Sequence, residues 1–217
     1  MVLRRSFPVA FLLGLIAAPA AFGQLKDSPI KFVDRDAIIT SFVAAPNLNT
    51  GDTPSSVPGE ASQWLKVEFH YGTTSALKTP FLDTVEFRVW VEGLDPLATN
   101  SQGGKGVGVA FTGSVTYINI AGGKDIYGVF YVHPSTIARY SSSRGVEDFN
   151  RKFDVHLQAL VGGVVMDEIN KNKEQDPLGW YKPLTAIPGL VYRQDQSPFL
   201  VSDTSHYPAI KLPAPAQ

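Results

Sequence analysis

The feature that most constrains the fold is a period of two in the apolar residues of three separate stretches. The apolar members are Leu65, Val67, Phe69 and Tyr71 in the first stretch, Val85, Phe87, Val89 and Val91 in the second, and Phe153, Val155, Leu157, Ala159 and Val161 in the third. Successive side chains of a strand point to opposite faces, whereas on a helix these sets would scatter around the cylinder. The alternation therefore predicts antiparallel strands with one face on a core and the other toward water.

Other elements are predicted from the runs between these stretches. Residues 126–132 are apolar on both faces, which is typical of a central strand covered on both sides. Glycine can adopt positive φ at little cost, so the Gly122-Gly123 pair before them predicts a tight hairpin turn from a strand over residues 115–120. Proline is tolerated at a helix start, so residues 134–142 are expected to form one or two helical turns across an end of the sheets.

The C-terminal part of the chain is rich in proline, with seven prolines between Pro177 and Pro215. Proline cannot donate to a ladder, so strands in this part, such as residues 190–192, are predicted to be short and at an edge. Residues 46–62 are interpreted as a flexible loop and residues 213–217 as a disordered tail. These elements together predict a mainly all-β fold, an immunoglobulin-like antiparallel β-sandwich with one short helix, and a closed barrel is the competing architecture.

Residues 1–23 have the three-part layout of a cleavable signal peptide. A basic start precedes an apolar run from Phe7 to Ala18, and small residues place the cut between Gly23 and Gln24. The run is shorter than the roughly 20 apolar residues that a membrane span needs. We therefore expect residues 24–217 to form one exported domain without a membrane-spanning segment, in the periplasm or associated with the outer membrane or cell surface.

The charge balance narrows the classes of partner. Loss of Arg4 and Arg5 with the signal peptide lowers the Lys and Arg total from 19 to 17, against 20 acidic residues, so the mature charge is about −3. This balance argues against a nucleic acid partner, which requires a basic patch. The chain has no cysteine, so its core must hold the fold without a disulfide in an oxidising compartment.

Motifs for cofactor, metal or nucleophilic chemistry are incomplete. Residues 103–108 look like a phosphate-binding loop, but Gly106 stands where serine or threonine is required and strand sequence follows, which favours an inter-strand loop. The histidines lack the spacing that directs two of them toward zinc from one helix face, and His70 and His156 are expected to be solvated on outward strand faces. The chain also lacks a Gly-x-Ser-x-Gly elbow. We expect no cofactor, no metal and no catalytic residue.

The acidic residues are interpreted as solvated charges. Asp34 and Asp36 lack the pattern of a calcium loop and precede a strand predicted over residues 37–43. Glu86 and Glu92 share a strand face but lie about 20 Å apart, which is too far for a glycosidase pair. A closer pair from two strands, such as Glu68 with Glu86, stays open at this point.

Three aromatic residues are the candidate ligand or partner sites: Trp90, Tyr127 and Tyr131. Trp90 falls on the outward phase between Arg88 and Glu92, where three interpretations compete. It is covered by a loop or by the Pro-rich stretch, or it is a platform for glycan stacking, or it belongs to a partner interface. Tyr127 and Tyr131 share one strand face and carry the same ambiguity.

Three segments carry a family resemblance: residues 64–69, 81–87 and 196–199. In order and spacing across residues 25–212, the chain resembles exported immunoglobulin-like proteins of Verrucomicrobia that are encoded beside type IV pilus secretin genes. The resemblance implies a sandwich fold and a place in a pilus or outer-membrane assembly, and it brings no catalytic residues.

The expected function is that of an exported, non-catalytic interaction module, with envelope or pilus proteins as partners. Such a module would use a sheet edge or the Pro-rich stretch through backbone pairing. The alternative is a carbohydrate-binding β-sandwich with a glycan partner, and an exported hydrolase is the third interpretation.

Overall fold

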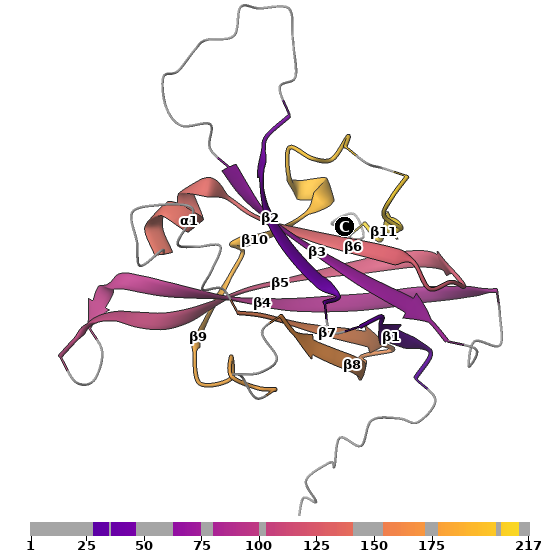
Figure 1. Ribbon diagram of the computed structural model, residues 1–217, viewed down its shortest axis with the longest axis horizontal. Helices are drawn as coiled ribbons and strands as arrows, with labels where there is room; N and C mark the ends of the chain where they lie inside the picture. The colour runs from indigo at the N-terminus through magenta and orange to yellow at the C-terminus, as the bar shows by residue number, and fades with distance from the viewer. Residues whose placement is uncertain are drawn as a thin grey trace, which may run out of the picture.

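The computed structural model describes residues 28–34, 36–46, 63–74, 80–99, 103–140, 154–171, 178–202 and 205–212 (Figure 1). Its strands are β1 (Ile30–Phe32), β2 (Ile38–Ala44), β3 (Gln63–Thr73), β4 (Phe81–Thr99), β5 (Lys105–Ala121), β6 (Ile126–Val132), β7 (Val155–Val161), β8 (Val164–Asn170), β9 (Thr185–Pro188), β10 (Val191–Arg193) and β11 (Ala209–Ile210). The helical elements are α1 (Pro134–Tyr140) and the 3-10 turn η1 (Gln194–Gln196).

The first sheet, sheet A, is built around β3. β6 pairs with one side of β3, and β10 pairs with the outer side of β6. β1 and β2 both pair with the other side of β3, β1 opposite residues 71–73 and β2 opposite residues 63–69. All of these pairings are antiparallel. Because β2 lies on the far side of β3 and β10 on the far side of β6, β2 and β10 form opposite edges of sheet A.

The second sheet, sheet B, has the order β5-β4-β7-β8 with antiparallel pairing throughout. Two short strands extend it beyond β5, with β9 parallel to residues 109–112 and β11 antiparallel to residues 117–118. The two sheets form separate layers, which confirms the predicted β-sandwich over the closed barrel. The immunoglobulin-like type of the sandwich stays a prediction.

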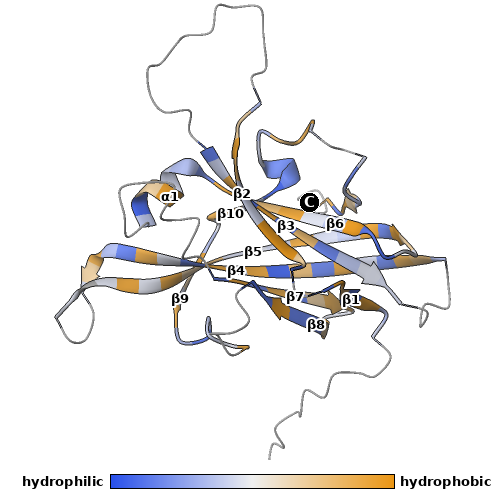
Figure 2. Ribbon diagram, viewed as in Figure 1, coloured by the Kyte–Doolittle hydropathy of each residue, from blue (hydrophilic) through white to orange (hydrophobic). Residues whose placement is uncertain are grey.

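The core lies between the sheets and includes residues that the alternation predicted to point inward. The side chains at 65, 67, 69 and 71 in β3, and at 85, 87, 89 and 91 in β4, are fully buried. The alternation is visible as colour changes along β4 in Figure 2. Phe130 is also fully buried, and β6 is covered on both faces from Gly128 to Val132, as predicted. Phe153 lies outside the described residues.

The predicted hairpin at Gly122-Gly123 is wrong, because β5 belongs to sheet B and β6 to sheet A. The segment between them crosses from one sheet to the other, and neither glycine adopts positive φ. The tight Gly-Gly hairpin joins β7 to β8 instead, with Gly162 at φ 59° and Gly163 at φ 81°. Both Gly-Gly pairs have the local sequence of a hairpin turn. Only the pair whose two flanking strands belong to the same sheet forms one.

The short helix α1 confirms the prediction of one or two helical turns after Pro134. Its buried residues Ile137 and Tyr140 face the core, and the Tyr140 ring lies 5.1 Å from that of Phe111 on β5. The helix also contacts β3 and β4, so it closes one end of the gap between the sheets (Figure 1).

The Pro-rich part forms short edge strands, as predicted. β9 and β11 pair with the edge of sheet B, and β10 pairs with the edge of sheet A. Residues 1–23, 47–62 and 213–217 lie outside the described residues, so the signal peptide, the loop and the tail stay predictions. Among the residues that the structure describes, no helix is long and apolar enough to cross a membrane.

Candidate functional site

The outer face of sheet B carries two rows of side chains that cross the strands. In one row Trp90 on β4 stands opposite Thr112 on β5 and His156 on β7. In the next row Arg88 stands opposite Ser114 and Gln158. The rows exist because these residues occupy the outward phase of their strands, one pleat apart. They place aromatic and hydrogen-bonding groups on one continuous surface.

An open groove of about 590 Å³ adjoins this surface, where the chain from Pro188 to Gln196 passes β5 on its way from sheet B to sheet A. We call it the Trp90 groove. Its aromatic and polar side chains are Arg88, Trp90, Thr112, Ser114, Arg193 and Gln196. They come from β4, β5, β10 and η1, so the groove forms only when the C-terminal part of the chain packs against sheet B.

Gly113 on β5 determines how closely that part approaches. A Cβ atom at this position would lie 2.9 Å from Cβ of Val191 on β10, a separation that real side chains do not adopt. The absent side chain therefore lets β10 cross directly over β5 while Val191 enters the core. This crossing forms the wall of the groove that carries Arg193.

Each arginine of the groove is held by a carboxylate two residues away. Nε and Nη2 of Arg88 donate to Glu86 at 2.7 and 3.3 Å. Nε and Nη2 of Arg193 donate to Asp195 at 3.0 and 2.8 Å. The paired geometry fixes both guanidinium planes and balances their charges.

Trp90 lines the groove and is also covered in part by the Pro-rich stretch. The ring of Tyr181 lies 4.5 Å from that of Trp90, and the ring of His156 lies 5.4 Å away. Tyr181 belongs to residues 178–184, which lie over the outer face of β7. Trp90 is therefore half-buried, with its ring position fixed by two neighbouring rings.

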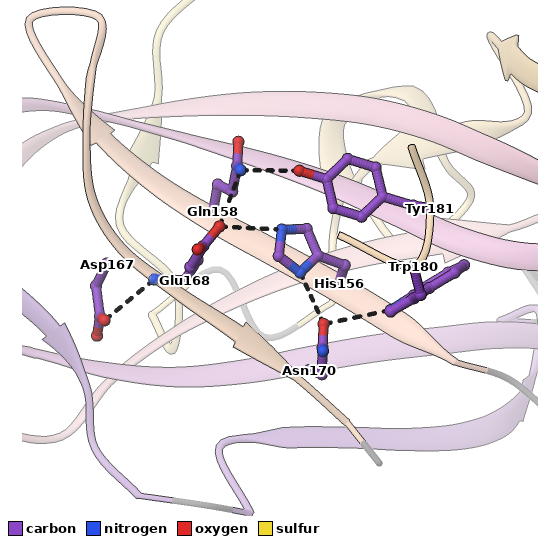
Figure 3. Close-up of polar contacts among 7 residues, drawn as sticks. All are labelled: His156, Gln158, Asp167, Glu168, Asn170, Trp180 and Tyr181. Carbon is purple, nitrogen blue, oxygen red and sulfur yellow. Dashed lines mark hydrogen bonds and ion pairs between the residues drawn. The ribbon is translucent and has the colours of Figure 1, made fainter. Parts of the chain in front are cut away.

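A polar network attaches residues 178–184 to β7 and β8 (Figure 3). The Nδ1 atom of His156 lies 2.7 Å from Oδ1 of Asn170, and Nε1 of Trp180 donates to the same oxygen at 3.3 Å. On the neighbouring row, the Gln158 amide donates to the hydroxyl of Tyr181 at 3.1 Å. Both aromatic residues of the segment are thus tied to the sheet.

The second half of the network joins Gln158 to Glu168. The Gln158 amide donates to Oε2 of Glu168 at 3.1 Å, and the same carboxylate oxygen lies 3.6 Å from Nε2 of His156 (Figure 3). That ring nitrogen is buried without a hydrogen-bond partner among the described residues. Burial lowers the pKa of His156, and the contacts with Asn170 and Glu168 oppose this shift only in part.

The prediction that His70 and His156 are solvated is wrong. His156 is fully buried, because Trp180 and Tyr181 cover the outward face of its strand. The His70 side chain is 18% exposed and stacks on Tyr127 with ring centroids 4.5 Å apart. Strand phase placed both residues on outer faces correctly, but it carries no information about which segment covers those faces.

Tyr127 and Tyr131 lie on the other side of the molecule, on the outer face of sheet A. Tyr131 is buried beneath Phe199, with parallel rings 4.4 Å apart. Tyr127 is stacked between His70 and His206. The structure therefore does not bring the two tyrosines together with Trp90, and Tyr131 is closed off by the C-terminal part of the chain.

Alternatives left open by the sequence are also resolved by position. Glu68 and Glu86 lie on different sheets and on outward strand positions, so they do not form a carboxylate pair. Residues 103 and 104 belong to the connection between β4 and β5, as the inter-strand interpretation predicts, but residues 105–108 are already the first part of β5 and not loop. In the part of the chain that the structure describes, no three His, Asp or Glu side chains form a metal-binding group.

No sequence pattern indicated four of the site residues: Thr112, Ser114, Arg193 and Gln196. Thr112 and Ser114 lie just before the strand predicted over residues 115–120. Arg193 and Gln196 join the site through packing between parts of the chain that are far apart in sequence. Only the facing of β4 with β5 and the crossing of β10 identify them.

Comparisons with known proteins agree with this architecture. A crystal structure of a protein from Akkermansia muciniphila is similar to the chain, with a TM-score of 0.65 and 17% sequence identity over 85% of this chain and 94% of that one. At this identity the likeness shows the fold alone. Akkermansia is a member of the Verrucomicrobia, the group to which the sequence resemblance pointed.

No curated protein matches the chain. A family model, however, matches residues 30–213, which include every strand of both sheets. Because this match spans well over half of the 217 residues, the chain belongs to the family that the model describes.

Proposed function

We propose that the protein is an exported, non-catalytic interaction module of the cell envelope that serves a type IV pilus or another outer-membrane assembly. Three observations support this proposal: the signal-peptide pattern of residues 1–23, the family match over residues 30–213, and the sandwich shared with the Akkermansia protein. The observation that favours the proposal most is that one edge strand of sheet A lacks the charges and prolines that usually prevent pairing with another chain.

That edge is β2, a strand of seven residues. It pairs with β3 along its whole length and with no other strand among the described residues. Its sequence, IITSFVA, contains no charged residue and no proline, and Ile39 is 52% exposed. Natural edge strands are usually protected from pairing with other chains by charges, proline or bulges. An unprotected edge with high β-propensity is suited to accept a strand from a partner.

The outer edge of sheet B differs in the features that matter for pairing. β8 contains Asp167 and Glu168, and the Asp167 carboxylate accepts a hydrogen bond from the backbone of Phe32 at 2.9 Å. β1 lies against β8 and covers part of it. Of these two edges, β2 is therefore the better surface for strand addition.

Position-specific crosslinking in the native host tests this proposal. Ile39 on β2 and Val164 on β8 are both 52% exposed, so they form a matched pair of edge positions. A photoreactive residue at position 39 is expected to give a discrete adduct with an envelope protein, and one at position 164 is not. Ile39→Lys should abolish the adduct from a neighbouring position such as 41, while Val164→Lys should leave it unchanged.

Two results would contradict the proposal. Equal adduct patterns from positions 39 and 164 would show that β2 has no special role. Crosslinks that are insensitive to Ile39→Lys would show that the partner does not pair with this edge.

A further inference from the structure

We propose that the Trp90 groove is a binding site for a neutral glycan, with one uncharged pyranose unit held against Trp90. This inference does not rest on strand addition at β2, because the residues that line the groove come from β4, β5 and residues 188–196, and none of them belongs to β2. It is argued from three properties of the groove: a fixed aromatic residue, paired hydrogen-bonding groups without net charge, and an open shape.

Trp90 supplies the apolar surface that such a ligand needs. Aromatic rings that combine a large apolar area with a polar end are favoured where ligands bind. Trp90 is half-buried and in contact with Tyr181 and His156, and it also lines the groove. Its ring is therefore already positioned in the free protein, which reduces the conformational entropy lost on binding.

The polar lining matches the hydroxyl groups of a sugar. Ser114 and Thr112 carry hydroxyl groups that both donate and accept hydrogen bonds. The side-chain amide of Gln196 donates from its nitrogen and accepts at its oxygen. Arg88 and Arg193 each use their Nε and Nη2 edge toward a carboxylate. A guanidinium has five N–H donors, so each arginine keeps donors directed away from its carboxylate.

The charge of the groove distinguishes a neutral sugar from an acidic one. Arg88 is paired with Glu86 and Arg193 with Asp195, so each positive charge has a negative charge within hydrogen-bond distance. An anionic ligand would have to compete with these carboxylates and would be repelled by them at short range. Uncharged hydroxyl groups meet no such opposition and can accept hydrogen bonds from the two arginines that line the groove.

The shape of the groove fits part of a larger glycan. Its volume of about 590 Å³ is within the range of ordinary small-molecule sites, but it is open to solvent along the sheet surface. An open site leaves room for the neighbouring units of an oligosaccharide to extend into water. The volume and the open shape together indicate that the groove recognises one sugar unit, either within an oligosaccharide or at its end.

Binding of defined glycans to the secreted protein tests the inference. The probes are neutral oligosaccharides of galactose, glucose and N-acetylhexosamines, together with sialylated and sulfated counterparts, first on an array and then by calorimetry. We expect saturable binding of at least one neutral probe with a Kd below about 1 mM, and at least tenfold weaker binding of its acidic counterpart.

Variants locate the site. Ser114→Tyr places a bulky side chain in the groove at an exposed position and should weaken binding at least tenfold, as should Trp90→Ala. Ser205→Tyr makes the same exchange at an exposed serine outside the groove and should leave affinity unchanged. Because Trp90→Ala also removes contacts to Tyr181, the Ser114 variant keeps the test independent of local unfolding.

The outcomes separate this inference from the proposed function. No binding of any neutral probe, preference for the acidic probes, or full binding by the Ser114→Tyr protein would each overturn the glycan site. None of these results bears on the crosslinks at position 39. Conversely, Ile39→Lys should bind glycan like the unmodified protein, whatever its effect on the envelope partner.

Discussion

Phe87 lies at the centre of the aromatic core, and its environment makes a residue-scale prediction. Its ring centroid is 4.6 Å from that of Phe69 and 4.7 Å from that of Tyr71, and the side chain is fully buried. Phe87→Ala, or Phe130→Ala on β6, should therefore lower the free energy of unfolding by roughly 3 to 5 kcal/mol. Urea denaturation of the purified variants measures this loss.

The neighbouring residue provides the control. Arg88 has an exposed side chain, and its ion pair with Glu86 lies on the surface. Exposed pairs contribute little to stability, so Arg88→Ala should change the free energy of unfolding by less than about 0.5 kcal/mol. A larger cost for Arg88→Ala than for Phe87→Ala would mean that the strand phase is reversed.

His156 makes a second prediction at this scale, for the dependence of stability on pH. Its pKa is lowered in the folded protein, mainly because burial disfavours the charged imidazolium. In the unfolded chain the pKa is about 6.5, so the unfolded state binds the proton first as pH falls. The unfolding free energy should therefore decrease as pH falls through about 6.5, until the lower folded-state pKa is passed.

Replacement of the ring isolates this contribution. His156→Gln keeps a neutral hydrogen-bonding group beside Asn170 and cannot titrate, so its urea midpoint should depend less on pH between about 7.5 and 5.5 than that of the unmodified protein. Identical pH dependence in the two proteins would show that protonation of His156 is not coupled to folding.

At the scale of the elements, the two Gly-Gly pairs show what local sequence can and cannot predict. Both pairs follow a strand and precede another, and the backbone freedom of glycine is the same in each. Only the pair at 162–163 joins strands of one sheet, and only that pair uses positive φ. Strands were predictable because alternation is a local property, whereas pairing partners depend on residues far apart in the chain.

The difference between the pairs is testable. Gly163 has φ 81°, a conformation that costs an L-residue roughly 1 to 2 kcal/mol, so Gly163→Ala should destabilise the protein by about that amount. A Cβ atom at Gly123 would have no neighbour within 4 Å, and the residue has no positive φ. Gly123→Ala should therefore be neutral, or stabilising by up to about 1 kcal/mol. Thermal unfolding of both variants decides whether the two turns differ in this way.

In the candidate site too, some features could be predicted from local sequence, whereas others depend on long-range packing. The outward phase of Trp90 followed from β4 alone. Tyr181, Arg193 and Gln196 reach the same surface through irregular chain whose path is set by packing, and no periodicity marks them. The burial of His156 follows from the same packing, which is why a residue in the outward phase is inaccessible to solvent.

At the scale of the whole molecule, export makes a simple prediction about the chain that reaches the envelope. If residues 1–23 are a cleaved signal peptide, the secreted protein begins at Gln24. Intact mass of material exported by a bacterial host measures the site of the cut. A membrane-bound product that retains Met1 would contradict the prediction.

The Pro-rich part holds the two sheets together and covers both of them. β9 extends sheet B, and three residues later β10 joins sheet A with Val191 in the core. Beyond β10, Phe199 and Tyr207 complete a second apolar cluster on the outer face of sheet A. Tyr207 also donates from its hydroxyl to Glu68 on β3 at 2.7 Å. The segment is thus part of the folding unit and not an appendage to it.

Truncation of the C-terminus tests this role. A chain that ends at Leu184 lacks β9, β10 and β11, so it leaves the edge of β6 unpaired and exposes Val129 and Tyr131, both of which are buried in the intact protein. It should lose cooperative unfolding in urea and bind a hydrophobic dye, as expected when tertiary packing is lost but collapse remains. A chain that ends at Leu212 keeps every described strand and should unfold at the same urea concentration as the full protein. Cooperative unfolding of the shorter chain would instead mean that the two sheets pack stably without the segment that joins their edges.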